Sequence, residues 1–250
     1  MAVSGAAPLP VEILTFFRGL GIPVSEIYGL SETCGPLTWS PNAQRNGFVG
    51  EPIPGEEVAL ADDGEVLVRG ANIFSEYLKD EEKTSEAIDG DGWFHTGDIG
   101  IFDDGQLKIV DRKKELIITA GGKNVSPANL EAHLKTSPYI FNAFVVGDGQ
   151  KYLGALIILD PEALDFFAGM NGLSGKDATF AELSKHAGIK AEVEKAVETA
   201  NSHVSSAESI RKFFILDHEW LPDSDVLTPT MKLKRKIVNE KYANEIASMF

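Results

Sequence analysis

The sequence predicts an α/β fold, because segments with helical spacing of apolar residues alternate with short apolar runs typical of strands. Residues 55–110 contain two pairs of such runs, and Asp-Asp-Gly joins each pair in the manner of a tight β-hairpin. The charge also changes along the chain: residues 1–110 hold 6 basic and 19 acidic side chains, whereas residues 111–250 hold 17 and 19. This change predicts a domain boundary at the charged run from Asp111 to Glu115.

The first 50 residues predict a strand, a helix, a second strand and a loop. The helix, residues 8–21, has Pro10 near its start and a broad apolar face. Residues 1–5 and 22–28 are strand-like, and the segment that follows, to about Gly50, is a loop rich in Gly, Ser and Pro.

Residues 55–110 predict a small all-β unit. The Asp-Gly step of each Asp-Asp-Gly supplies the positive φ angles that a two-residue hairpin turn requires. Between the two hairpins, residues 81–88 favour one or two helical turns.

After Arg112 the pattern becomes mixed α and β. Predicted strands cover residues 116–119, 143–146, 153–159 and 213–216. Predicted helices cover residues 127–134 with Ser126 as the N-cap, residues 189–204 and residues 236–249.

Composition excludes several classes of protein. The chain has 250 residues, and 23 Lys and Arg against 38 Asp and Glu give a net charge of −15, which disfavours nucleic-acid binding. The single cysteine, Cys34, rules out an internal disulfide and favours a cytosolic compartment. The strongest apolar run, residues 155–159, is far shorter than the roughly 18 residues of a membrane span. We therefore expect a soluble, acidic, intracellular protein.

The stretch EIYGLSETCGP combines groups that suit a nucleotide site. Tyr28 can stack on a base, the Ser31 hydroxyl can reach a phosphate oxygen, and the Glu32 carboxylate can hold Mg²⁺. The alternative is a surface turn with a buried tyrosine.

The stretch GWFHTGDIG places Asp98 between Gly97 and Gly100, which let the backbone approach a ligand closely. A carboxylate there can accept both hydroxyls of a ribose, as in dinucleotide-binding folds. An ordinary turn-forming aspartate is the alternative. His95 lies beside it, and the sequence offers no His pair with metal-ligand spacing.

Two further stretches carry clustered charge. IVDRKKELIITAGGKNVSP joins four charged residues, 111–114, to a double glycine, Gly121 and Gly122, and the alternative is a solvated hairpin corner. LTPTMKLKRKIV presents Lys232 after a Thr-Pro-Thr turn, where a lysine can meet an anion; the alternative is a solvated helix face.

Together with SGAAP at residues 4–8, these four stretches resemble the adenylate-forming ligases, most closely the long-chain fatty-acid–CoA ligases. The resemblance covers essentially the whole chain. Ser31 stands where the family pattern Tyr-Gly-x-Thr-Glu has threonine, and Met231 precedes Lys232 where most members have glycine. The family's Lys-Gly phosphate loop and its acyl-binding half are absent, so we expect the C-terminal portion of a ligase that lacks its N-terminal half.

The resemblance implies a role for each matching residue. The catalytic set is Lys232, Ser31 and Glu32, with Glu32 as the Mg²⁺ ligand. The nucleotide and coenzyme A set is Gly5, Ala6, Ala7, Tyr28, Asp98, Arg112, Gly121 and Gly122. Lys114 is the implied hinge, about which a small domain would rotate between two half-reactions.

The resemblance also implies an architecture and an activity. A remnant of the large domain's parallel-sheet subdomain would cover residues 1–50, a distorted β-barrel residues 51–111, and an α+β lid domain residues 112–250. The parent enzyme would activate a long-chain fatty acid with ATP to acyl-AMP and transfer the acyl group to coenzyme A. Two alternatives stay open: an acyl-AMP ligase that loads a carrier protein, and a non-catalytic fragment without the phosphate loop. The isolated chain is expected to be inactive, and the parent to be cytoplasmic, with room for peripheral membrane contact.

Overall fold

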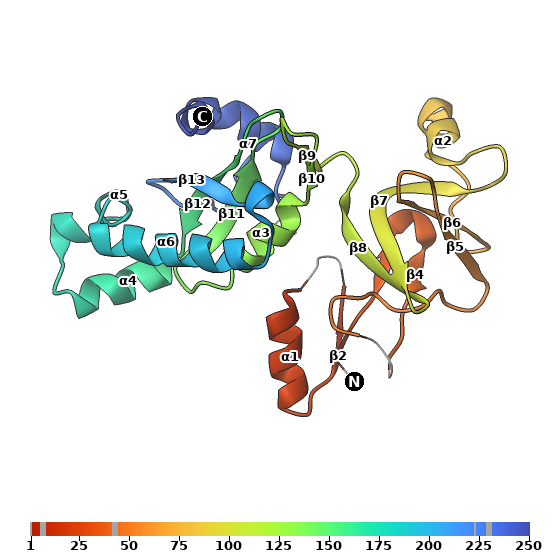
Figure 1. The fold of residues 1–250 in the computed structure, drawn as a ribbon, viewed down its shortest axis with the longest axis horizontal. Coiled ribbons are helices and arrows are strands. Elements are labelled where there is room, and N and C mark those ends of the chain that lie inside the picture. Colours follow the sequence, from red (N-terminus) through yellow and green to blue (C-terminus); the bar gives the residue numbers. More distant parts are fainter. Residues whose placement is uncertain (1, 6–8, 42–44, 223, 229–231) are drawn as a thin grey trace. The chain divides into compact units, whose positions relative to one another are not determined.

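The computed structural model describes residues 2–5, 9–41, 45–222, 224–228 and 232–250 (Figure 1). The chain divides into two compact units, Met1–Glu115 and Leu116–Phe250, here called the first and second units. The finer division at residue 50 stays a prediction. Among the described residues, no helix has both the length and the apolar character needed to cross a membrane.

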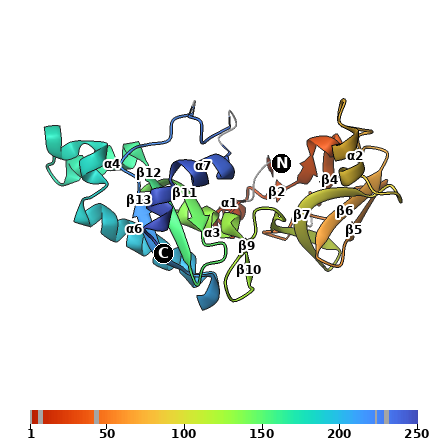
Figure 2. The ribbon, with the colours of Figure 1, turned by 90° about the horizontal axis from the view of Figure 1, so that it is seen from above.

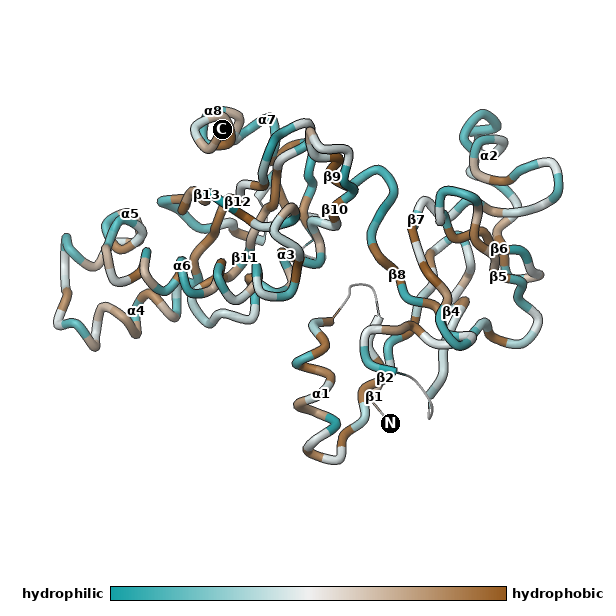
Figure 3. Tube along the Cα trace, in the orientation of Figure 1, coloured by the Kyte–Doolittle hydropathy of each residue, from teal (hydrophilic) through white to brown (hydrophobic). Residues whose placement is uncertain are grey.

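The first unit begins with a β-α-β arrangement. Strand β1 (Ala2–Ser4) pairs in parallel with β2 (Val24–Glu26), and helix α1 (Val11–Gly19) connects them. The parallel pairing agrees with the predicted parallel sheet. Of the residues of α1 only Leu14 is buried, so the apolar side chains of Phe16 and Leu20 are exposed, and the α1 trace in Figure 3 alternates between brown and teal.

The loop predicted after Tyr28 is wrong, because a further hairpin forms there. Strand β3 (Tyr28–Leu30) pairs antiparallel with β4 (Gly35–Thr38), and a 3-10 turn, η1 (Ser31–Thr33), joins them. The Thr33 hydroxyl stabilises the turn, since it accepts a hydrogen bond from the Leu30 N–H at 2.9 Å. The strands approach closely at Gly29, where a Cβ would lie 2.1 Å from the Gly35 carbonyl oxygen. Tight pairing therefore requires glycine at this position.

The rest of the first unit is a four-stranded antiparallel sheet in the order β5-β6-β7-β8. Its strands are β5 (Glu56–Leu60), β6 (Glu65–Gly70), β7 (Phe94–Asp103) and β8 (Gln106–Arg112), with helix α2 (Glu81–Ala87) between β6 and β7. Both predicted hairpins are confirmed, and Gly64 and Gly105 take the positive φ angles of their turns. The core beneath the sheet contains Leu37, Val66, Val68, Phe94 and Leu107.

The second unit is built on a three-stranded sheet with helices on both faces. Strand β12 (Leu153–Leu159) lies in the centre, antiparallel to β11 (Ile140–Val146) and parallel to β13 (Ile210–Ile215). All seven residues of β12 are buried, and alternate side chains enter two separate cores, so both faces are covered. The trace of β12 is accordingly largely brown in Figure 3.

One core of the second unit packs under helices α3 (Pro127–Leu134), α4 (Pro161–Met170) and α6 (Ala187–Ser202), and the other packs under α7 (Arg235–Lys241). Figures 1 and 2 show α6 and α7 on opposite sides of the sheet. The smaller elements are β9 (Ile117–Ile118), β10 (Asn124–Val125), η2 (Gly175–Ala178), α5 (Phe180–Leu183), η3 (Ser206–Glu208) and α8 (Ala243–Ala247).

Two details of the second unit differ from the prediction. The closing helix over residues 236–249 is broken at Tyr242 into α7 and α8. The ring of Tyr242 is buried, and its hydroxyl accepts a hydrogen bond from the Trp220 indole N–H at 2.8 Å, which fixes the chain at the break. Helix α4 was not predicted, although Asp160 caps it and Pro161 stands at its first position. The Ser126 cap of α3 is confirmed, because its side chain accepts from the Asn129 N–H.

Candidate nucleotide-binding site

A buried carboxylate with two partners forms the centre of the candidate site. Asp98 lies in strand β7 and its side chain is 4% exposed. The Tyr28 hydroxyl donates to Asp98 Oδ2 at 2.6 Å, and the Arg112 Nε lies 2.8 Å from Oδ1. Tyr28 comes from the start of β3 and Arg112 from the end of β8, so three strands of the first unit contribute to one cluster. The sequence-predicted residues Tyr28, Asp98 and Arg112 are therefore in direct contact.

The local backbone fixes the direction of Asp98. Gly97 has φ +71°, a left-handed conformation that glycine adopts at little cost. The Thr96 hydroxyl donates to the Val66 carbonyl at 2.7 Å and accepts from the Asp98 N–H at 3.1 Å. An irregularity in the β7–β8 pairing between Ile99 and Gly100 then sets Asp98 opposite Arg112.

Burial controls the charge of this cluster. It raises the pKa of the Asp98 carboxyl, although the Tyr28 hydrogen bond and the Arg112 charge oppose the shift. Burial and the neighbouring Asp98 charge also raise the pKa of the Tyr28 hydroxyl, so Tyr28 stays a neutral donor. The Arg112 side chain is 52% exposed and can reach a ligand while it holds Asp98. Since a carboxylate has about four lone-pair positions, Asp98 keeps capacity for further donors.

Glu32 and Ser31 follow Tyr28 on the same segment but make different contacts. Glu32 is half-buried; its Oε1 accepts from the Tyr77 hydroxyl at 2.9 Å, and its carbonyl accepts from the Phe74 N–H at 2.7 Å. Ser31 is exposed at the start of η1. Within the described ranges, Glu32 shares no hydrogen bond with the Asp98 cluster. The sequence alone did not identify Tyr77 as the partner of Glu32, because no pattern in the sequence marks it.

The SGAAP stretch is described only in part. Gly5 directly follows β1, and a Cβ at this position would lie 3.0 Å from Cγ1 of Ile27. The Ile27 N–H donates to the Ser4 carbonyl at 2.8 Å, so the end of β1 lies beside the residue that precedes Tyr28. Ala6 and Ala7 lie outside the described residues.

The remaining predicted residues are exposed. Lys114 stands in the turn that ends the first unit. In the second unit, Gly121 and Gly122 form the turn between β9 and β10, and the Gly122 N–H donates to the Thr119 carbonyl at 2.8 Å. Lys232 is exposed; its N–H donates to the Thr228 hydroxyl at 2.9 Å, and its carbonyl accepts from the Thr228 N–H at 2.8 Å.

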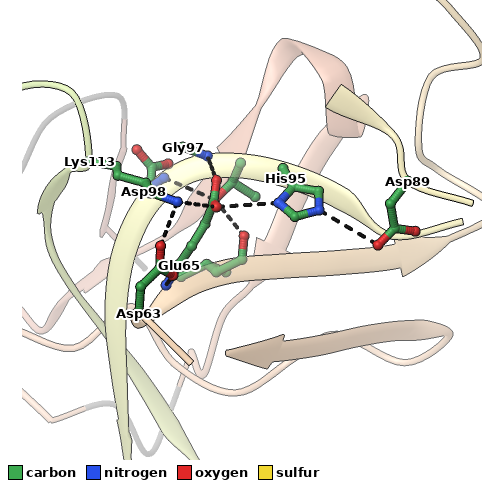
Figure 4. A network of polar contacts seen from close by, with 9 residues as sticks. Asp63, Glu65, Asp89, His95, Gly97, Asp98 and Lys113 are labelled. Carbon is green, nitrogen blue, oxygen red and sulfur yellow. Dashed lines mark hydrogen bonds and ion pairs between the residues drawn. The ribbon is translucent and has the colours of Figure 1, made fainter. Parts of the chain in front are cut away.

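Sequence reasoning also missed a charged network beside the Asp98 cluster, shown in Figure 4. At its centre is Glu65, whose side chain is 8% exposed and lies 2.9 Å from the Lys113 ammonium and 3.3 Å from the His95 ring. The available signal was the position of Glu65 itself, an acidic residue directly after a hairpin turn and before an apolar run, which is ordinarily interpreted as solvent-exposed.

Comparison with known proteins identifies the family of the chain. Residues 1–78 match the family described as AMP-binding enzyme, and residues 114–250 match the AMP-binding enzyme C-terminal domain. The chain belongs to the AMP-binding enzyme family. The resemblance to adenylate-forming enzymes and the mixed α/β fold predicted from the sequence are thus confirmed.

Curated relatives of this AMP-binding enzyme chain are named as ligases. It is 49% identical over its whole length to the long-chain-fatty-acid–CoA ligase FadD15 of Mycobacterium bovis, of which it covers 42%. It is 40% identical, over 99% of its length, to the long-chain-fatty-acid–CoA ligase ACSBG2 of Gallus gallus, of which it covers 35%. The chain thus spans less than half the length of these relatives.

Solved structures share the fold. The O-succinylbenzoate coenzyme A synthetase of Bacillus subtilis, in complex with AMP, matches 94% of this chain and 44% of its own, with a TM-score of 0.69 and 26% identity. The adenylation domain of a carboxylate reductase from Mycobacterium chelonae matches 99% of this chain and 38% of its own, with a TM-score of 0.78 and 24% identity.

Proposed function

We propose that this chain is the part of a long-chain fatty-acid–CoA ligase that binds AMP and carries the catalytic lysine. The parent enzyme would use ATP to convert a fatty acid to acyl-AMP and would then transfer the acyl group to coenzyme A. The observation that carries the proposal is the Tyr28–Asp98–Arg112 cluster, a buried carboxylate held by a neutral donor and a half-exposed cation. The names of the relatives support the choice of substrate class.

In this proposal Asp98 accepts the ribose hydroxyls of the nucleotide. Its orientation is fixed before the ligand arrives, so binding costs little side-chain entropy. Arg112 both aligns the carboxylate and offers its exposed guanidinium edge to the ribose. Tyr28 would present its ring for stacking on adenine, while its hydroxyl holds Asp98.

In this proposal Ser31 and Glu32 bind the phosphate end of the nucleotide. Glu32 fits a magnesium ion, because Mg²⁺ in nucleotide enzymes is typically held by one or two carboxylates together with phosphate oxygens and water. The half-buried Glu32 supplies one such carboxylate, and the Tyr77 hydroxyl orients it. The ion would neutralise phosphate charge, and the exposed Ser31 hydroxyl would donate to the α-phosphate.

The second unit would supply groups for the two half-reactions. The exposed Lys232 would provide the cation for adenylate formation. Gly121 and Gly122 would let the thiol arm of coenzyme A approach the backbone in the thioester step. Lys114 would be the hinge, since it stands in the turn where the two units join.

Calorimetric titration of the chain with AMP tests the nucleotide site. The matched pair of variants is Asp98→Asn, which removes the charge of the buried carboxylate, and Asp103→Asn, which removes an exposed carboxylate of the same strand, paired with Arg45. We expect Asp98→Asn to weaken AMP binding about tenfold or more and Asp103→Asn to leave it unchanged. An AMP affinity that is equal in the two variants would overturn the site.

The acyl acceptor is tested in the full-length enzyme. Supplied acyl-AMP should be converted to thioester when coenzyme A is added, and an acyl carrier protein should not replace it. Preference for the carrier protein would favour the alternative ligase class.

A further inference from the structure

A buried glutamate joins the two strands that carry the Asp98–Arg112 pair (Figure 4). Glu65 begins strand β6, and its Oε1 accepts from the Gly97 N–H at 2.9 Å. Its Oε2 accepts from the Lys113 ammonium at 2.9 Å and lies 3.3 Å from Nδ1 of His95. One carboxylate therefore contacts both strand β7 and the end of strand β8.

The positions it contacts flank the candidate site. Gly97 immediately precedes Asp98, and Lys113 immediately follows Arg112. The Lys113 N–H also donates to the Gly97 carbonyl at 2.7 Å, so backbone and side chain hold the same two residues together. Gly97 has a left-handed conformation, and the β7–β8 pairing is irregular between Ile99 and Gly100, two residues further along β7. The Glu65 side chain adds a second constraint to the backbone hydrogen bond between Lys113 and Gly97.

The energetics of burial make this contact strong. A buried charge without partners costs several kcal/mol, typically more than any single hydrogen bond returns. Burial would raise the pKa of Glu65, but the hydrogen bonds from Lys113, His95 and Gly97 together lower it below its ordinary value. The carboxylate is thus ionised in the folded protein at neutral pH. Both partners of Glu65 make a further contact: the Lys113 ammonium lies 2.6 Å from Asp63 Oδ2, and Nε2 of His95 lies 3.6 Å from Asp89 Oδ2.

From this geometry we infer that Glu65 is a positioning residue for ribose recognition. Its carboxylate holds Gly97 and Lys113 so that Asp98 and Arg112 face the nucleotide together. Glu65 itself touches no ligand. The inference rests on the proposed nucleotide site and adds to it a residue that the sequence analysis did not single out.

The test measures how well the chain tells AMP from 2′,3′-dideoxy-AMP, which lacks both ribose hydroxyls. The main variant is Glu65→Gln, which keeps the shape but turns an amide donor toward Lys113 and His95. The matched control is Glu57→Gln, which removes an exposed carboxylate of the same sheet, paired with Arg69. We expect wild type and the control to prefer AMP by about tenfold or more, and Glu65→Gln to lose most of that preference. A merely structural role would weaken both nucleotides equally and leave the preference intact.

The outcomes separate this inference from the proposed function. If wild type shows no preference for AMP, the ribose role of Asp98 fails, and the positioning role of Glu65 falls with it. If Asp98→Asn abolishes the preference and Glu65→Gln retains it, only the role of Glu65 is overturned. Should Glu65→Gln fail to fold, Lys113→Met decides, because it removes the partner beside Arg112 and leaves the Gly97 contact in place. An unchanged preference in Lys113→Met would then overturn the inference.

Discussion

The two units present their predicted functional residues in opposite ways. In the first unit Tyr28, Asp98 and Arg112 are fixed by short hydrogen bonds around a buried carboxylate. In the second unit Lys232 and the glycines at 121 and 122 are exposed. Under the proposed function this difference would be a division of labour: the first unit would bind nucleotide with little reorganisation, and the second would offer groups that are accessible to different partners.

The exposed lysine gives the largest expected effect. In the full-length enzyme, Lys232→Ala should lower adenylate formation by roughly 10²–10³-fold, because a cation that stabilises developing phosphate charge is lost. Thioester formation from supplied acyl-AMP should be unchanged. Pyrophosphate release and thioester yield, measured separately, give the two rates. Lys236→Ala, a nearby exposed lysine, is the control, and an equal loss in both half-reactions would contradict the division of labour.

The two units also differ in their ion pairs, and this predicts a difference in stability. In the second unit Arg235 Nη2 lies 2.7 Å from Glu131 Oε1, with both side chains at most 16% exposed, whereas the Arg112 side chain of the first unit is half exposed. Arg235→Met would leave the buried Glu131 carboxylate without its cation, which should destabilise the second unit by about 3 kcal/mol. Hydrogen exchange measured by mass spectrometry reports each unit separately.

The control for that experiment is Arg211→Met, which removes an exposed arginine that bonds Ser206 in the same unit. Its effect should stay within about 0.5 kcal/mol. Faster exchange in both units of the Arg235→Met protein would show that their stabilities are not separate.

Removal of one hydroxyl from the first unit has a smaller effect. Tyr28→Phe should weaken AMP binding about tenfold, because a hydrogen bond to a charged group is lost while the ring is kept. That bond lowers the pKa of Asp98 against the effect of burial, so its loss should raise the pKa further. AMP binding should then decline at a higher pH than in wild type as the solution is made acidic. Titrations with AMP between pH 4 and 8 measure both changes. If AMP binding declined at the same acidic pH in Tyr28→Phe and in wild type, the role of the hydroxyl would be contradicted.

Comparison of the prediction with the structure shows where sequence reasoning ends. The Asp-Asp-Gly turns fixed both hairpins, since turn chemistry is local. Regular pairing from the second turn would have set Asp98 opposite Asp111, but the irregularity between Ile99 and Gly100 sets it opposite Arg112. A one-residue shift in register moves the side chains of a strand to the opposite face of the sheet, and no local feature of the sequence predicts it.

The other misses have the same origin. The hairpin after Tyr28 depends on the burial of Leu37, which is a tertiary contact, in addition to the local hydrogen bond between Leu30 and the Thr33 hydroxyl. The break at Tyr242 depends on Trp220, more than 20 residues earlier in the chain. The Glu65 network joins three strands and could not be found from any single segment. Local pattern therefore predicted most of the elements, and the resemblance to a known family supplied the roles of the candidate residues, whereas register and long-range polar contacts required the structure.

The smallest of the expected effects is the loss of stability of the first unit at acidic pH. Hydrogen bonds and ion pairs lower the pKa of Asp63 and of Glu65, against the opposing effect of burial. A carboxyl whose folded pKa lies below its unfolded value stabilises the fold above the unfolded value, which is about 4, and this stabilisation is lost as the pH falls through the folded value. Acidification from pH 6 to pH 3 should therefore speed hydrogen exchange in the sheet of the first unit. In the Glu65→Gln protein, hydrogen exchange in this sheet should already be faster than in wild type at pH 6, and acidification should accelerate it less. In the Glu57→Gln protein, acidification should accelerate exchange as strongly as in wild type, because the Glu65 network is intact.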